Sequence, residues 1–143
     1  MTKRRFSKIF LSSLLLIICL LSFPAHSAIE FPTPTNYKYL NDYVGVINNS
    51  EVNSIISIGK ELEDKTGAQA VVVIIDSTNN VPIEEYANKL FRTWGIGQED
   101  KDNGLLILLS INDKAWRVEV GRGLEGAIPD ALSNRIMESL AKP

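Results

Sequence analysis

The sequence predicts an α/β fold: a three-layer α/β/α sandwich around a small mixed sheet with a C-terminal β-hairpin arm. Two observations support this prediction. Continuous apolar runs at residues 70–75 and 105–109 are typical of strands that are buried on both faces. Segments with apolar residues at helical spacing separate and follow these runs. This alternation along the chain favours a sheet covered by helices.

The first elements are a short strand and a helix. We expect the strand near residues 42–46. The helix carries apolar residues along one face and ends at Gly67. Asn48-Asn49-Ser50 is a glycosylation sequon, but we interpret it as the start of this helix, with Ser50 as the capping residue.

Two further amphipathic helices are predicted. One begins near Pro82, which suits a first helical position, and ends before Gly95. The other begins near Pro129 and carries apolar residues at helical spacing as far as Leu140.

A β-hairpin lies between these two helices. Asn112-Asp113 forms a turn after the 105–109 run, and residues 116–120 alternate apolar and polar side chains. A two-residue turn at this point pairs Leu105 with Val120 and Gly104 with Gly121.

The first 27 residues have the features of a secretory signal peptide. Basic residues precede an apolar run at 9–23, and Ala25 and Ser27 provide small residues at the two recognition positions before a cleavage point after Ser27. The run of about 15 residues is shorter than the roughly 20 that span a bilayer, which argues against the alternative that this segment is an N-terminal membrane anchor. We expect no transmembrane anchor after signal cleavage. We therefore expect an exported protein, periplasmic or secreted, with a signal peptide at 1–27, an extended linker at 28–40 and one α/β domain at 41–143.

Cleavage restricts the available chemistry, because Cys19 and His26 are the only cysteine and histidine in the chain. The mature protein therefore has no disulfides, no thiolate zinc site and no histidine general base. Four of the 15 basic residues are also removed, which leaves 11 against 17 acidic residues and a net charge of about −6. Such a charge excludes nucleic acid as a partner and suits divalent cations.

Two sequence motifs are excluded on their context. Residues 121–126 match G-x-G-x-x-G, but they follow the second arm of a hairpin, and no acidic ribose partner appears about 20 residues on. The acidic run from Asp100 resembles the start of an EF-hand loop. Its glycine comes one position early, and Ile111 stands where the loop needs a bidentate glutamate.

Polar side chains are predicted to converge at the open end of the hairpin. Asp102 and Asn103 precede its first arm, and Glu125 and Asp130 follow its second. Carboxylates gathered there would repel one another unless a cation lay among them. Oxygen ligands select hard ions, so we expect calcium or magnesium. Two alternatives stay open: Asp130 only caps the last helix, and the acidic loop is only solvated.

The position of Asp42 depends on the direction of the first strand. If the earlier strands run parallel to the first arm of the hairpin, Asp42 lies at the same end as Asp102, and Asp76 lies at the opposite end.

An ordered set of motifs resembles the TPM domain family. The residues that carry the resemblance are Asp42-Tyr43-Val44-Gly45-Val46, Glu84-Glu85-Tyr86-Ala87, Trp94-Gly95-Ile96-Gly97, Asp102-Asn103-Gly104-Leu105-Leu106-Ile107 and Gly121-Arg122-Gly123-Leu124-Glu125-Gly126. The resemblance implies an α/β/α sandwich with a surface acidic site for calcium or magnesium. The positions that match the family's polar signature are Asp42, Asp102, Asn103, Glu125 and Asp130. Family members usually continue past the last helix, which implies a short or truncated domain here.

The resemblance implies two functions, since some members are acid phosphatases and others are accessory proteins for membrane complexes. The first expectation is an exported calcium- or magnesium-binding module that helps to maintain or assemble membrane or envelope proteins. The second is a metal-dependent acid phosphatase, with Arg122 as the candidate phosphate ligand. Without histidine, the leaving group must take its proton from a carboxylic acid. The sequence assigns no catalytic residue.

Overall fold

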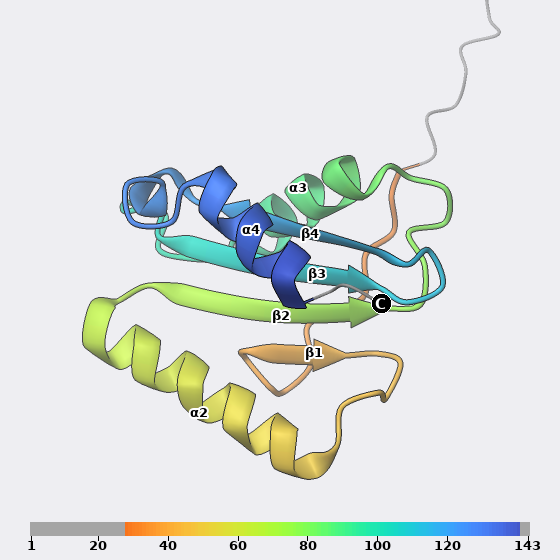
Figure 1. The fold of residues 1–143 in the computed structure, drawn as a ribbon, viewed down its shortest axis with the longest axis horizontal. Helices are drawn as coiled ribbons and strands as arrows, with labels where there is room; N and C mark the ends of the chain where they lie inside the picture. The colour runs from red at the N-terminus through yellow and green to blue at the C-terminus, as the bar shows by residue number, and fades with distance from the viewer. Residues whose placement is uncertain (1–27, 141–143) are drawn as a thin grey trace, which may run out of the picture. The chain divides into compact units, whose positions relative to one another are not determined.

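The computed structural model describes residues 28–140 (Figure 1), and a compact unit begins at Phe31. The predicted signal peptide, residues 1–27, lies outside the described residues, and so do Cys19 and His26. Within the described range, no helix has both the length and the apolar character needed to cross a membrane.

The described residues form a four-stranded mixed sheet in the order β1-β2-β3-β4. The strands are β1 (Leu40–Asp42), β2 (Gln69–Ile75), β3 (Gly104–Ser110) and β4 (Ala115–Val120). The first three are parallel, and β4 is antiparallel to β3. The helical elements are α2 (Asn49–Thr66), α3 (Ile83–Trp94), the 3-10 turn η1 (Arg122–Leu124) and α4 (Asp130–Leu140). In Figure 1, α4 lies in front of the sheet and α3 behind it, which confirms the predicted α/β fold with helical layers.

The core lies between the central strands and α3. β2 and β3 run side by side in a register that pairs Val71 with Leu106 and Val73 with Leu108. All four side chains are buried, as is Leu90 of α3. Burial of each large aliphatic side chain stabilises the fold by about 1.5–3 kcal/mol. The two continuous apolar runs are therefore strands, as predicted.

Caps fix both ends of α2. The Asn48 side chain accepts a hydrogen bond from the Glu51 backbone N–H (3.0 Å), and the Glu51 side chain accepts one from the Asn48 backbone N–H (3.3 Å). This is a capping box, so the prediction of Ser50 as the cap is wrong by two residues. At the other end Gly67 adopts the left-handed conformation (φ 74°), as a helix stop requires.

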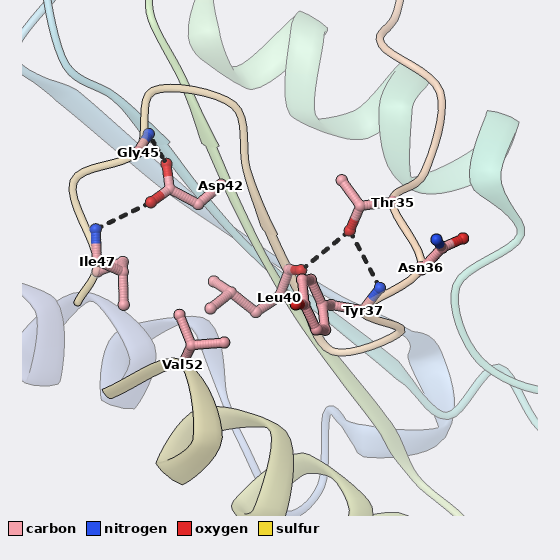
Figure 2. Close-up of a pocket in the computed structure, with 8 residues that line it drawn as sticks. All are labelled: Thr35, Asn36, Tyr37, Leu40, Asp42, Gly45, Ile47 and Val52. Atoms are coloured by element: carbon pink, nitrogen blue, oxygen red, sulfur yellow. Dashed lines mark hydrogen bonds between the residues drawn. The ribbon is translucent and has the colours of Figure 1, made fainter. Parts of the chain in front are cut away.

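The first strand begins two residues and ends four residues earlier than predicted, because the Asp42 carboxylate organises a turn where the sequence predicted a strand. One carboxylate oxygen accepts hydrogen bonds from the backbone N–H groups of Val44 (3.0 Å) and Gly45 (2.7 Å), and the other accepts from Ile47 (2.9 Å). The Gly45 and Ile47 contacts are drawn in Figure 2. Because these N–H groups bond to the carboxylate rather than to β2, β1 ends at Asp42.

The predicted linker, 28–40, is docked on the domain from Phe31 onward. The Phe31 ring packs edge-on against Tyr86 of α3, with ring centroids 5.0 Å apart. The indole N–H of Trp94 donates to the Pro32 carbonyl (3.2 Å), and the Tyr43 hydroxyl donates to the Thr33 carbonyl (2.5 Å). This segment therefore forms part of the compact unit, and its last residue belongs to β1.

The hairpin has the predicted register. Leu105 lies opposite Val120, and the Gly121 N–H donates to the Gly104 carbonyl (2.8 Å). The ladder closes at Ser110 and Ala115, so the turn is longer than the predicted two residues.

Candidate functional site

The open end of the hairpin carries a cavity of about 480 Å³. Asp102 from the loop before β3, Glu125 from the turn after η1 and Asp130 at the start of α4 all line it. These three residues are the ones that the sequence predicts to converge. The cavity is also lined by Asn88, Arg92, Arg117, Glu119 and Arg122.

Glycines bring the two loops of the cavity together. The Gly123 N–H donates to the Asp102 carbonyl (3.0 Å). A Cβ atom on Gly121 would lie 2.1 Å from that same carbonyl oxygen, and one on Gly123 would lie 2.0 Å from the Lys101 carbonyl oxygen. These glycines of the G-x-G-x-x-G motif therefore permit contact between backbones, a role unrelated to dinucleotide binding.

Asp102 occupies a tight turn that leaves its side chain exposed. Its φ of 47° is left-handed, and its backbone N–H donates to the Gln98 carbonyl (2.8 Å). Within residues 28–140, the carboxylates of Asp102, Glu125 and Asp130 have no hydrogen-bond or ion-pair partner. All three are therefore free to bind a ligand in the cavity.

The three carboxylates do not form a ready-made metal centre. In the described part of the chain, no three acidic side chains are grouped so that they could hold a metal ion. A cation that uses all of them would have to draw these exposed side chains toward it.

Asn103 does not contribute its side chain to the cavity. It is buried, its Nδ2 donates to the Gly67 carbonyl (2.8 Å), and its Oδ1 accepts from the Gln98 N–H (2.8 Å). The amide thus joins the loop before β3 to the end of α2, and both of its polar atoms are already used.

Asp42 lies at the opposite end of the sheet from Asp102, so its expected position is corrected. Asp42 pairs with Ile74, which pairs with Leu109 near the turn of the hairpin. The strands are parallel as expected, but β1 ends at Asp42 instead of beginning there.

The environment of Asp42 favours its charged form. Burial raises the pKa of Asp42, but the hydrogen bonds from the Ile47, Gly45 and Val44 N–H groups outweigh it, so the pKa is lowered. Asp42 lines another cavity, of about 460 Å³ (Figure 2), in which it is the one acidic residue among the described lining residues. With its carboxylate occupied by backbone groups, Asp42 has a structural role.

Asp130 is the first residue of α4, and it does not cap the helix. In the first turn the N–H groups of Leu132 and Ser133 donate to the Pro129 carbonyl, and the Asp130 carboxylate accepts no hydrogen bond from a described residue. A carboxylate in the first turn is favoured by the helix dipole. Because Asp130 lines the cavity and its carboxylate is unbonded in the described part of the chain, it is available to a cation.

Sequence reasoning missed the cationic side of the cavity. Arg92 comes from α3 and Arg117 from β4, and both line the cavity with the predicted Arg122. The Arg117 Nε donates to the Glu119 carboxylate (2.8 Å), and the Asn88 amide donates to its other oxygen (3.3 Å). One signal was present, because Arg117 and Glu119 alternate with apolar residues and so share a face of β4. Among the described residues, Arg92 and Arg122 have no charged partner.

Comparisons with known proteins identify the family. Residues 40–143 match the family model TPM_phosphatase, described as the TPM domain. No curated protein matches the chain.

The chain is also similar to solved structures, two of which are N-terminal domains of bacterial proteins. The N-terminal domain of a protein from P. gingivalis is 31% identical, with a TM-score of 0.69 over 75% of this chain and 68% of that one. The N-terminal domain of the cg2496 protein from Corynebacterium glutamicum is 21% identical, with a TM-score of 0.60 over 80% of this chain and 75% of that one. The second likeness concerns the fold only. From the family match, which covers most of its length, the chain belongs to the TPM domain family.

Proposed function

We propose that this domain binds a divalent cation, calcium or magnesium, through Asp102, Glu125 and Asp130. One observation carries the proposal: three carboxylates from separate stretches of chain line one cavity, and none has a partner among the described residues. The cavity also holds arginines, but none of those described is paired with these three carboxylates, and carboxylates that lie near one another without a cationic partner favour a cation between them. Hard ions take carboxylate oxygens and complete their coordination with water.

The proposed biological role is that of an exported accessory module, periplasmic or secreted, that helps to maintain or assemble membrane or envelope proteins. The expected signal peptide and the family support this role. Asp42 and Asn103 are left out of the proposed ligand set, because backbone groups already occupy their polar atoms.

Calcium titration tests the cation site. A ligand that binds only the folded state, at a hundred times its Kd, stabilises a protein by about 2.7 kcal/mol, so the Tm of the wild type should rise clearly. Asp102→Asn should lose most of this rise. The matched control is Asp100→Asn, since Asp100 is an exposed acid of the same loop that does not line the cavity.

An equal rise in Tm for Asp102→Asn and wild type would place the ion elsewhere and contradict the proposal. Magnesium titrated in the same way compares the two ions.

A second candidate is a metal-dependent acid phosphatase, which the arginines of the same cavity favour. Arg92 and Arg122 are exposed and have no partner among residues 28–140. Guanidinium groups bind phosphate oxygens in a forked geometry. A cavity with both free carboxylates and free guanidinium groups could hold a phosphate ester beside a cation, with a carboxylic acid as proton donor at acidic pH.

Hydrolysis of p-nitrophenyl phosphate at acidic pH, with calcium or magnesium present, tests this candidate. Arg122→Ala should reduce the rate on the order of a hundredfold, as for loss of a charge-stabilising donor. Asp102→Asn should also reduce the rate, because it removes a proposed ligand of the cation. Arg135→Ala is the control, since Arg135 is an exposed arginine of α4 that does not line the cavity. Activity that survives both changes would come from another site or a contaminant.

A further inference from the structure

The two edges of the sheet differ in how their backbone groups are satisfied. At the β1 edge, the Leu40 N–H donates to the Tyr37 carbonyl (3.3 Å), and the Thr35 hydroxyl donates to the Leu40 carbonyl (3.3 Å). Figure 2 shows the Thr35 hydroxyl directed at Leu40. β4 forms the other edge and is outermost on its side of the sheet in Figure 1. An edge strand with unpaired groups is a surface for pairing with another strand.

The register identifies which groups of β4 point outward. The hydrogen bond between Gly121 and Gly104 fixes the alternation of the antiparallel ladder, so Glu119 and Arg117 bond to β3. The backbone N–H and C=O groups of the residues between them, Trp116, Val118 and Val120, then face away from β3. In the described residues, no hydrogen bond from outside the strand reaches these groups.

We propose that β4 pairs antiparallel with β4 of a second copy of this chain, about a two-fold axis at Val118. In this register Val118 lies opposite its equivalent, and Trp116 lies opposite Val120 of the second copy. Each of these outward residues exchanges both backbone hydrogen bonds with its opposite residue. The two sheets become one continuous sheet with an isologous interface.

The side chains of β4 are complementary to themselves in this register. On one face Trp116 meets Val120 of the second copy, an aromatic and β-branched pair of the kind that stabilises sheets. On the other face Arg117 meets Glu119 of the second copy, so opposite charges lie across the axis twice and like charges do not face each other.

This self-complementarity favours a second copy over a strand of another protein. A partner strand must offer an acid opposite Arg117, a base opposite Glu119 and apolar residues between them, and β4 itself has this pattern. The Arg117 side chain is 34% exposed and uses its Nε–H for Glu119, which leaves its other N–H donors for a second carboxylate, whereas the Glu119 side chain is 13% exposed and would accept from the second copy in addition to Arg117 and Asn88.

The pairing also bears on the cavity, although it does not depend on the proposed function. Arg117 and Glu119 line the cavity, so the same residues of the second copy lie beside it across the axis. The two cavities of the dimer therefore lie on the same face of the joined sheet, on either side of the paired strands.

Charge reversal tests the pairing. Sedimentation equilibrium of protein purified after expression of the full chain should give a concentration-dependent dimer. Arg117→Glu and Glu119→Arg should each weaken it about tenfold or more, because each places like charges across the axis. A mixture of the two variants should restore dimers, which contain one copy of each, since the acidic face of one variant then meets the basic face of the other.

Restoration by mixing separates the interface from the contact within one chain, because mixing cannot repair an intramolecular ion pair. Amide hydrogen exchange of the wild type gives a second measurement should a variant fail to fold. The Val118 amide should exchange more slowly as concentration rises, whereas the Arg117 amide, bonded to β3, should not change. The proposal would be overturned if the protein stayed a monomer at all concentrations. It would also be overturned if both charge reversals left the dimer unchanged.

Discussion

Gly121 lies so close to the loop before β3 that a single methyl group would collide with it. The Cβ of Gly121→Ala would meet the Asp102 carbonyl oxygen at 2.1 Å, and backbone atoms cannot move aside cheaply. We expect this variant to lose about 1–3 kcal/mol of unfolding free energy, the usual cost of overpacking. It should also lose calcium binding, because the loop that carries Asp102 must shift. Urea unfolding and calcium titration measure the two effects.

Gly126→Ala is the matched control, with the same change in the same motif. A Cβ at Gly126 meets no atom within 4 Å. Its stability should stay within about 0.5 kcal/mol of the wild type, as for most surface substitutions. Equal losses in both variants would show that backbone contact is not what requires glycine at position 121.

The sequence predicted part of the set of side chains that meet at the cavity, but it did not predict the hydrogen-bond partners of the others. Asp102, Glu125 and Asp130 were predicted to converge because the hairpin register follows from a turn and a two-residue period. Asn103 and Asp42 were predicted beside them as ligands. Their polar atoms instead bond to backbone groups, and such local geometry depends on loop conformations that a residue pattern does not define.

A network around Asp113 joins two loops at the end of the sheet opposite the cavity. Its carboxylate accepts hydrogen bonds from the Ser110 hydroxyl (2.6 Å), the Thr78 N–H (2.8 Å) and the Ser77 hydroxyl (3.0 Å). The Ser110 hydrogen bond, followed by that from Thr78, lowers the pKa of Asp113 to about 2. The turn of the hairpin is thereby tied to the loop between β2 and α3.

Asp113→Asn should therefore make the fold less stable at neutral pH and less sensitive to acid. The pKa of Asp113 is lower in the folded state than the roughly 3.9 of an unfolded chain. Its contribution is thus fully present above about pH 4 and is lost as pH falls toward about 2. Urea midpoints measured through this range should fall less steeply for Asp113→Asn than for wild type. The control is Asp100→Asn, and an identical slope in wild type and Asp113→Asn would contradict the assignment.

Elements with strong periodicity were predicted correctly, and the weakest one was displaced. β2, β3 and α3 follow from continuous apolar runs and a helical stripe. β1 has only three residues and no clear period, and the turn organised by the Asp42 carboxylate ends it. Asp42 is therefore the last residue of the strand and not the first, which places it at the opposite end of the sheet from the predicted one.

At the scale of the whole molecule, the layered fold was predictable from the sequence. Of the charged residues that line the cavity, the carboxylates and Arg122 were predicted, but the other arginines were not. The order of strands and helices gives a covered sheet through general packing rules. Arg92 and Arg117 reach the cavity because α3 packs behind β4, and no spacing in the sequence brings these two residues together. An acidic patch was expected, and a cavity of mixed charge was found.

The segment from Thr35 to Tyr37 bonds to the outward backbone groups of Leu40 in the edge strand β1. Since the N–H and C=O groups of Leu40 are already bonded within the same chain, a strand of another molecule finds no free backbone group at that position. A strand of another molecule cannot be added at Leu40 unless these hydrogen bonds break first, so this part of the β1 edge is protected against pairing with another chain.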